Sequence, residues 1–493
     1  MGVSKGSTMG EKYHAPGSTF ATMAVRAMAP PPRTGWSAGW IDPLCWALLV
    51  FNGWFAVHFA SERILVDAAY FLVRMVDDAG FFVSHGRWIM PLSQGLAVLA
   101  IKLALPLRAV IALYSLGGVV VAGMAYFFVR YVLQDHRAGL AVVASQFIGV
   151  GHAVFCPVFE FYYAAPLLLA CLALLRSTRL APPLQGVWFS ALLFLVFSSH
   201  FLAMLVAGMA LLLAGVHCQR HLRWLAMAML VLHLIIRSVV LSDYERRAIT
   251  SLWIRFEGLG WTWVFRPGRL LGHLEHMLSV YPDVVFLYVL LMAALVQVRA
   301  WRTLAAFLGG VLVLYVLQSF YFPDGTHSVY REFVDHPFAV WAVVVPYILG
   351  ARPVPGLGPW YKALGLFLVL RCMLWLDLSG TYADRVAWIR SRIDAAHEQG
   401  IGLGLVKDVP TFITPRWGSV KLPGLEPMET VLLSATDGTS STVLLLPWSD
   451  TTATAAEMDT TLEARMRAER IPLPWDTPSP YFDLPRTPLR VVR

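Results

Sequence analysis

Residues Leu44–Val57 read "LCWALLVFNGWFAV", and residues His58–Trp88, which follow directly, read "HFASERILVDAAYFLVRMVDDAGFFVSHGRW". The first run is almost entirely apolar and predicts, with its flanks, a membrane span over about 43–60. The second run brings aspartate, glutamate and arginine to the edge of that span. A charged side chain at a membrane boundary is costly unless it faces a cavity or a partner. Together the runs predict a membrane protein with functional carboxylates beside its first span.

The composition of the whole chain agrees with this interpretation. Of the 493 residues, 57% are hydrophobic and only 14% are charged, whereas a water-soluble domain carries about 25% charged residues. Apolar runs recur as far as Leu378, which predicts a polytopic α-helical membrane protein. Basic residues collect in the cytoplasmic loops of such proteins. The formal net charge of +8 is explained in this way, and we expect no nucleic-acid partner.

The N-terminal region argues against a cleaved signal peptide, and the cysteines argue against disulfide and zinc sites. Residues 1–40 are rich in Gly, Pro, Ser, Thr and Met and predict a disordered cytoplasmic tail. They lack the cleavage site of a signal peptide, so we expect the first span to be an uncleaved anchor. The cysteines have neither the spacing of a disulfide framework nor that of a zinc site, and we interpret them as packing residues. They are Cys45, Cys156, Cys171, Cys218 and Cys372.

The run over 91–105 decides the topology. It offers about fifteen residues between Pro91 and Pro106, with Lys102 inside, and a span needs about twenty. Counting it as a span would reverse the direction of every later helix. As an amphipathic helix lying at the membrane surface, it leaves basic residues in every loop assigned to the inside. This second interpretation places the N-terminus in the cytoplasm.

The resulting assignment has about eleven transmembrane helices. After the first, the predicted spans are 107–131, 139–156, 160–175, 186–199, 201–216, 223–241, 283–298, 303–322, 336–350 and 363–379. The segments expected outside are 61–91, 242–282, 323–335 and everything after Ser379.

The composition changes after Ser379, and we expect residues 380–493 to form a small α/β domain with a C-terminal tail on the outer side of the membrane. "YADRVAWIRSRIDAAHEQG" predicts a helix that ends at Gly400. Short apolar runs between Gly, Pro and Asp turns predict strands. These runs are "IGLGLV" (401–406), "TVLLSA" (430–435) and "STVLLLP" (441–447). From Asp450 the chain is Thr-rich and then Pro-rich, which is typical of a loosely ordered tail.

Two carboxylates near the first span are the leading candidates for function. On a helix over 66–79, Asp67, Arg74 and Asp78 share one face and valines lie on another, which predicts an amphipathic helix at the membrane surface. For the charges at the far end of this helix, simple solvation is the favoured interpretation. Glu62 and Asp67 lie where the chain leaves the bilayer, and there an unpartnered carboxylate is costly.

A third carboxylate, Glu160, stands alone among apolar and aromatic residues in "GHAVFCPVFEFYYAAPLLL". The predicted topology puts it on the same side as Glu62 and Asp67. A helix-capping or headgroup-level carboxylate is an equally good interpretation. His200 reaches this side as well, although a lone histidine at a turn is more often structural.

Basic and aromatic residues accompany these acids on the predicted outer side. His85 and Arg87 follow the amphipathic helix, Arg246 lies in a segment rich in Arg and Trp, and Arg331 precedes a later span. Arginine binds phosphate through two hydrogen bonds and tryptophan anchors at the headgroup level. A lipid with a phosphate headgroup would suit such a surface, and a generic interfacial belt is the alternative.

The order of these features resembles the GT-C glycosyltransferases, integral membrane enzymes that take sugars from polyprenyl-phosphate carriers. The first span is followed by an acidic loop, "SERILVDAAY" (61–70), and an interfacial helix. A second such helix, "PLSQGLAVLAIKLALPL" (91–107), precedes a span that ends in the basic turn "RYVLQDHRAG" (130–139). The pattern is similar to the arabinose- and mannose-transferring members over about residues 43–200.

The resemblance implies a GT-C-like fold in a bacterial inner membrane, in contact with membrane lipids. It also implies an inverting transfer of a sugar from a polyprenyl-phosphate carrier to a lipid or glycan acceptor. Asp67 and Tyr70 best match the family's acid and the tyrosine shortly after it. Asp67 would be the base, with Glu62 as second choice, because the family's adjacent acidic pair after span one is absent here. Glu160 would orient the acceptor or the sugar.

The remaining candidates would bind substrate. Arg87, Arg246 or Arg331 would stabilise the departing phosphate, and His85 and His200 would contribute to the same surface. We expect no resident metal site, with a loosely held divalent cation between Asp67 and Glu160 as the alternative.

Two other classes of protein remain open. A transporter or flippase for a lipid-linked or small polar substrate should have polar or broken helices near the bilayer midplane, often in paired repeats. The predicted spans are mostly apolar at their centres and show no internal repeat, which favours surface chemistry. The third class is a scaffold without catalytic activity whose outer domain binds envelope partners.

Overall fold

The computed structural model describes residues 38–214, 220–240, 242–321, 329–350, 357–414, 420–436, 438, 442–447, 481–483 and 490–492. The chain divides into two units, Met1–Trp40 and Ile41–Arg493. Of the first unit only a short 3-10 helix, η1 (Ala38–Trp40), is described. The predicted tail over 1–40 therefore lies almost wholly outside the described residues, as do Cys218 and most of the tail after Asp450.

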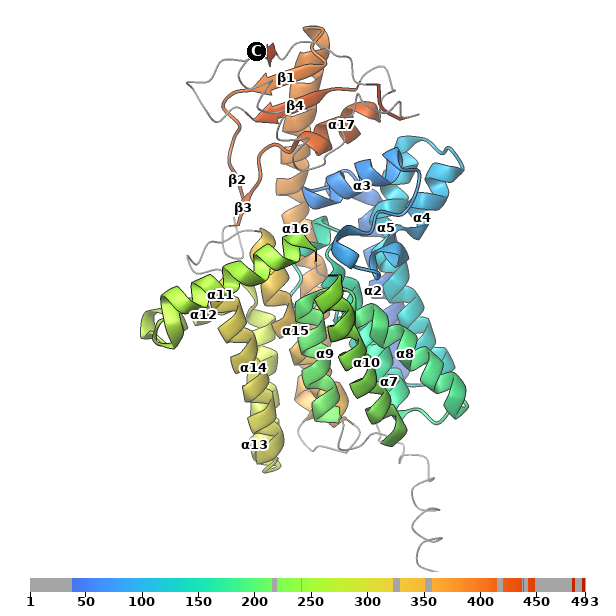
Figure 1. Ribbon diagram of the computed structural model, residues 1–493, viewed down its shortest axis with the longest axis vertical. Helices are drawn as coiled ribbons and strands as arrows, with labels where there is room; N and C mark the ends of the chain where they lie inside the picture. Colours follow the sequence, from blue (N-terminus) through green and yellow to red (C-terminus); the bar gives the residue numbers. More distant parts are fainter. Residues whose placement is uncertain are drawn as a thin grey trace, which may run out of the picture. The chain divides into compact units, whose positions relative to one another are not determined.

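The second unit is mainly helical (Figure 1). Its α-helices are α2 (Ile41–His58), α3 (Asp67–Asp77), α4 (Met90–Lys102), α5 (Leu107–Phe127), α6 (His136–Ala144), α7 (Glu160–Arg176), α8 (Pro182–Phe197), α9 (Phe201–Ala214), α10 (Arg220–Val239), α11 (Asp243–Val264), α12 (Pro267–Val280), α13 (Pro282–Gln297), α14 (Trp301–Tyr321), α15 (Val329–Leu349), α16 (Leu357–Glu398) and α17 (Pro427–Ala435). Shorter turns are η2 (Ser84–Gly86), η3 (Phe128–Val132) and η4 (Ala153–Phe155).

By length and composition, six helices of the described residues could cross a membrane. They are α2, α5 with its continuation to Val132, residues 221–239 of α10, α14, residues 330–349 of α15, and α16. A seventh span results if α12 and α13 are counted as one, although the chain bends by 107° between them. The fold is that of a polytopic helical membrane protein, and the number of about eleven spans stays a prediction.

One predicted span, 139–156, is wrong. Helix α6 ends at Ala144, and from there to Phe159 the chain is irregular apart from η4, although every residue of it is buried. Gly149 has a φ of +66°, which favours glycine, and a Cβ there would lie 2.3 Å from Ala339 Cβ. Irregular backbone within a membrane protein is tolerated where other parts of the protein meet its polar groups.

The carboxylate of Glu332 on α15 meets three of those groups. Its oxygens accept hydrogen bonds from the backbone N–H groups of Gly151 at 2.7 Å, His152 at 2.6 Å and Ala153 at 3.0 Å. Hydrogen bonds from N–H groups to a charged acceptor are among the stronger ones in proteins. A single side chain thereby satisfies a whole turn of buried irregular backbone.

A buried ion pair completes this arrangement. Asp283 of α13 pairs with Arg371 of α16, with Arg371 Nε 2.8 Å from Asp283 Oδ2, and the same oxygen accepts from Gly149 N at 3.2 Å. The carbonyl of Val150 accepts from Arg371 at 3.3 Å and from the indole of Trp375 at 2.9 Å. The segment between α6 and α7 is therefore held by three helices that follow it by more than a hundred residues.

The C-terminal part is carried by one long helix. α16 runs for 42 residues without a break, so the predicted span over 363–379 and the predicted helix after it are continuous. Strands β4 (Leu444–Pro447), β1 (Leu403–Val406) and β5 (Arg490–Val492) pair in parallel in that order, and β2 (Phe412–Ile413) pairs antiparallel with β3 (Lys421–Leu422).

The strand predicted for "TVLLSA" is wrong, because this run belongs to helix α17. All its residues are buried, and an apolar run without periodicity does not distinguish a strand from a buried helix. Pro427 at the first helical turn favours the helix.

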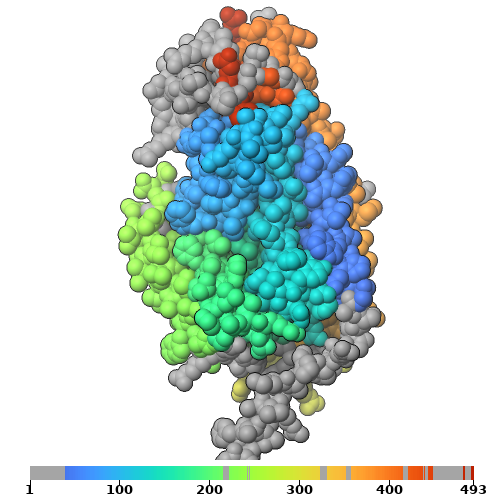
Figure 2. All heavy atoms as spheres, turned by 90° about the vertical axis from the view of Figure 1, so that its right-hand side faces the viewer, coloured from blue at the N-terminus to red at the C-terminus, as the bar shows by residue number. Residues whose placement is uncertain are grey.

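Helices α3 and α4 share a hydrophobic core with α5, α16, α17 and the parallel sheet. α17 packs directly on α3, and Figure 1 shows both beside the upper half of α16. Figure 2 shows the same contact as blue side chains of α3 and α4 against orange and red ones of the C-terminal part. One core thus joins the segment after α2 to the C-terminal strands.

Glu332→Gln should destabilise the protein. The amide has one acceptor oxygen in place of two, so at least one buried N–H of the 151–153 turn loses its partner, at a cost of about 1–3 kcal/mol for each donor left unmet. Thermal unfolding in detergent should show a lowered Tm. Glu398→Gln, at the exposed end of α16, is the matched control and should leave the Tm unchanged. An unchanged Tm in Glu332→Gln would contradict the role given to this carboxylate.

Candidate functional site

Asp67 is the first residue of α3, where the helix dipole favours a negative charge. Burial raises the pKa of its carboxyl above the ordinary value, the negative charge of Glu160 raises it further, and the positive charge of Arg87 lowers it. Asp67, Arg87 and Glu160 therefore lie within electrostatic range of one another. They come from the start of α3, the chain after η2, and the start of α7.

Arg87 and Glu160 form an ion pair with little access to solvent. Arg87 Nη1 donates to Glu160 Oε1, and the two side chains are 14% and 4% exposed. Glu160 begins α7, which is buried as far as Leu175 because α5, α6, α8, α9 and α15 pack around it. Arg87 follows η2, in which His85 has a φ of 52°. A central helix and a tight turn thus bring these opposite charges together.

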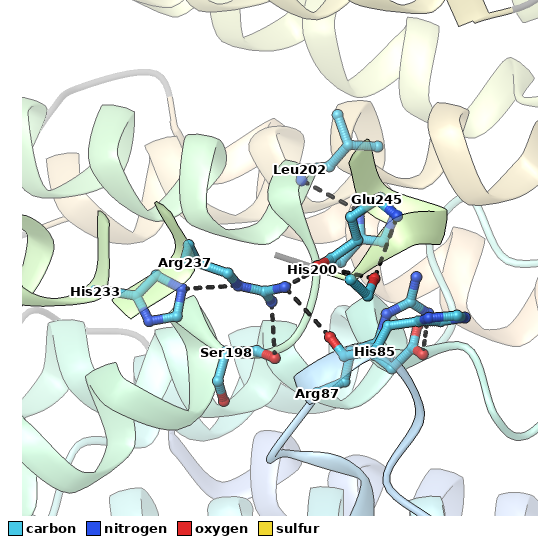
Figure 3. Close-up of polar contacts among 10 residues, drawn as sticks. His85, Arg87, Ser198, His200, Leu202, His233, Arg237 and Glu245 are labelled. Carbon is cyan, nitrogen blue, oxygen red and sulfur yellow. Dashed lines mark hydrogen bonds and ion pairs between the residues drawn. The ribbon is translucent and has the colours of Figure 1, made fainter. Parts of the chain in front are cut away.

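Arg237 near the end of α10 extends the polar cluster (Figure 3). Its guanidinium forms an ion pair with Glu245 in the first turn of α11. It also donates to the carbonyl of Ser198 at 3.3 Å and to that of His85 at 3.4 Å. Nε lies 3.3 Å from His233 Nε2. One side chain therefore ties α10, α11, the α8–α9 turn and η2 to one another.

His200 lies within electrostatic range of Arg87 and of Arg237. Its Nδ1 accepts a hydrogen bond from the backbone N–H of Leu202 at 3.2 Å, so the neutral ring carries its proton on Nε2. Burial, and to a lesser degree the positive charges of Arg87 and Arg237, lower the pKa of His200 to about 3. At neutral pH the side chain is thus an uncharged donor within electrostatic range of two guanidinium groups.

The structure brings together most, but not all, of the predicted site residues. Asp67, His85, Arg87, Glu160 and His200 belong to this cluster. Glu62 does not, because the charges that act on it are those of Arg390 on α16 and His58, and burial raises its pKa. The ring of Tyr70 packs edge-on against Phe82, with centroids 5.7 Å apart.

The two more distant arginines lie elsewhere. Arg246 is exposed on α11. Arg331 is buried at the start of α15, where its Nε lies 3.5 Å from Asp335 Oδ2. The same oxygen of Asp335 lies 2.7 Å from Nε2 of His276 on α12. Arg331 therefore belongs to a second buried network.

Reasoning from the sequence missed Arg237 and its partner Glu245. The available signal was an arginine within the otherwise apolar run over 221–239, since an ionisable residue in such a run usually has a partner or a function. Glu245 lies eight residues later, beyond the end of the helix. Nothing in its immediate sequence distinguishes it from a solvated charge.

The two carboxylates considered for a loosely held divalent cation, Asp67 and Glu160, lie within electrostatic range of the guanidinium of Arg87. The positive charge that would balance these acids is already present in a side chain. No group of three metal-ligating side chains is found among the described ranges.

Comparisons of the chain with protein-family models, with curated proteins and with solved structures found no match.

A double-mutant comparison tests the ion pair at the centre of the cluster. Arg87→Gln or Glu160→Gln alone removes one charge of a largely buried pair, at a cost of about 3–5 kcal/mol, and the double variant removes both charges. Thermal unfolding in detergent should therefore show a smaller loss of Tm for the double variant than for either single one.

The pair Arg74–Asp78 on the neighbouring helix is a matched control, since its side chains are 22% and 48% exposed. Exposed pairs contribute about 0.3–0.5 kcal/mol, so Arg74→Gln and Asp78→Asn should shift the Tm little. If the losses of Tm in Arg87→Gln and Glu160→Gln simply added up in the double variant, this would contradict an ion pair between the two largely buried side chains.

Proposed function

We propose that this protein is a membrane glycosyltransferase that transfers a sugar from a polyprenyl-phosphate carrier to a lipid or glycan acceptor of the cell envelope. The observation that supports it is the convergence of Asp67, Arg87 and Glu160 in one polar cluster. These residues lie on separate segments, and each was a candidate on grounds of sequence alone. A half-buried carboxylate with a raised pKa beside a fixed ion pair is typical of a site built for chemistry.

The proposed reaction is a single displacement with inversion. The Asp67 carboxylate takes the proton of the acceptor hydroxyl while that oxygen bonds to the anomeric carbon of the sugar. The bond from the anomeric carbon to the phosphate oxygen breaks, and its electron pair leaves with the polyprenyl phosphate. Glu160, held by Arg87, would accept hydrogen bonds from the sugar or the acceptor and fix its orientation.

The positive side of the cluster would receive the departing phosphate. Arg87 and Arg237 both act on His200, which offers an Nε2–H donor. Charged donors fixed in advance stabilise a developing phosphate charge at no further cost of reorganisation. Arg237 takes the place that the sequence assigned to Arg246 or Arg331.

The proposal includes an orientation in a bacterial inner membrane. Basic residues in the loops assigned to the inside put the N-terminus in the cytoplasm. The cluster and the strands after α16 would then face the periplasm, where a lipid-linked sugar and an envelope acceptor meet.

A transporter or flippase is the second candidate, and buried charges are the observation that favours it. Asp283, Glu332 and Arg371 are all buried within the bundle, as they would be along a transport pathway. All three, however, hold the irregular backbone between α6 and α7 in place. This structural role accounts for their burial and leaves the transferase as the better-supported function.

Asp67→Asn should lower the rate of transfer by about 100-fold or more, because a positioned base contributes at least that factor. The assay uses purified protein in liposomes with polyprenyl-phosphate-linked mannose or arabinose and an envelope glycan extract, and it measures release of polyprenyl phosphate. Asp78→Asn removes an exposed carboxylate from the same segment and should retain the wild-type rate.

Wild-type transfer by Asp67→Asn would contradict the assignment of the base. Movement of the lipid-linked sugar across the bilayer without release of polyprenyl phosphate would instead support the transporter.

The acidic limb of the pH–rate profile should report Asp67. The base acts in its ionised form, and its pKa is raised, so activity should be lost at a higher pH than for an ordinary aspartate. The charged groups that interact electrostatically with Asp67 are Glu160, Arg87 and Glu426. Glu160→Gln removes a negative neighbour and should move the limb to lower pH, whereas Asp78→Asn should leave it in place. A limb that stays fixed in Glu160→Gln would contradict the coupling.

A further inference from the structure

The residue before Asp67 has an unusual backbone conformation. Val66 precedes the first turn of α3 with φ 50° and ψ −109°. A positive φ is a genuine outlier for a β-branched residue. Such conformations persist only where the surroundings impose them, and they gather at functional sites. The question is which part of the protein imposes this one.

The contact that holds Val66 comes from the C-terminal part of the chain. Its backbone N–H donates to Glu429 Oε1 at 2.8 Å, across 363 residues of sequence. The other oxygen, Oε2, lies 2.7 Å from Arg385 Nη2, and both side chains are 1% exposed. Arg385 Nε donates in turn to the carbonyl of Pro423. Helix α16, helix α17 and the chain after β3 therefore fix one carboxylate against the start of α3.

We propose that Glu429 is a positioning residue for Asp67, so that the C-terminal part of the chain sets the direction of the catalytic carboxylate. The inference rests on the proposed transferase function. If the acceptor oxygen were lost, Val66 could relax to a negative φ, and the peptide before Asp67 would rotate. Asp67 would then move relative to Glu160 and Arg87.

The packing around this contact supports positioning over simple docking. α17 and α3 already share an extensive apolar core in which Val431 and Leu432 are fully buried beside Ala68 and Leu72. That core holds the two helices together without a hydrogen bond to one backbone N–H. The hydrogen bond from Val66 N–H to Glu429 instead acts on the one residue that directly precedes Asp67.

The test compares two substitutions at position 429 by steady-state kinetics on the full-length protein in liposomes. Glu429→Leu removes the acceptor, and kcat should fall at least tenfold while KM for polyprenyl-phosphate-linked mannose or arabinose stays within twofold. Glu429→Gln keeps an oxygen that accepts from Val66 N–H, and kcat should recover to within about threefold of wild type. Loss of the ion pair is common to both variants, so a purely structural role of the pair would lower both alike.

A cycle with Val66→Gly provides the second arm. Glycine adopts a positive φ without strain, so the conformation no longer needs Glu429 to impose it. The loss of kcat caused by Glu429→Leu should therefore be at least threefold smaller in the Val66→Gly background. An equal loss in both backgrounds, or wild-type kcat in Glu429→Leu, would overturn the proposal.

Hydrogen exchange separates failure of this inference from failure of the proposed function. The Val66 amide should be protected in the wild type and in Glu429→Gln, and it should exchange at least tenfold faster in Glu429→Leu. This readout requires no transfer activity, so it tests the contact even if no sugar is transferred. Unaltered protection in Glu429→Leu would refute the contact itself.

Discussion

The carboxylate of Glu332 accepts three consecutive backbone N–H groups inside the helical bundle, and much of the arrangement depends on it. Because these donors are met, the chain between α6 and α7 can run as irregular backbone through a buried region. Its course determines where α7 begins and therefore where Glu160 stands. The Asp283–Arg371 ion pair, between α13 and α16, holds the same segment through Gly149. The position of Glu160 therefore depends on charged residues that are not part of the polar cluster.

Two arginines on α16 hold different segments next to the polar cluster. Arg371 binds Asp283 and the carbonyl of Val150, which lies in the segment before α7. Arg385, fourteen residues further along, binds Glu429, which in turn holds Val66. Asp67 at the start of α3 and Glu160 at the start of α7 are thus each connected to α16, through two independent sets of contacts.

The sequence predicted the parts of the structure that local pattern controls. A helix lies within 66–79, another starts at Glu160, and strands lie within 401–406 and 441–447, because amphipathic period, short apolar runs and turn residues are local signals. The span over 139–156 failed for a physical reason: apolar residues bury equally well as helix or as irregular chain. The partners that decide between the two, Asp283 and Glu332, lie far along the sequence. The pairing of Arg237 with Glu245 was hidden for another reason: Glu245 lies only eight residues later, but beyond the end of α10.

The unbroken length of α16 gives the molecule a mechanical property. At 1.5 Å per residue its 42 residues make a rod of roughly 63 Å, and a rotation of about 5° around the midpoint moves either end by ~3 Å. Bilayer thickness alters the tilt of transmembrane helices. A change in the tilt of α16 would therefore be carried along the unbroken helix to Arg385 and the strands beyond it.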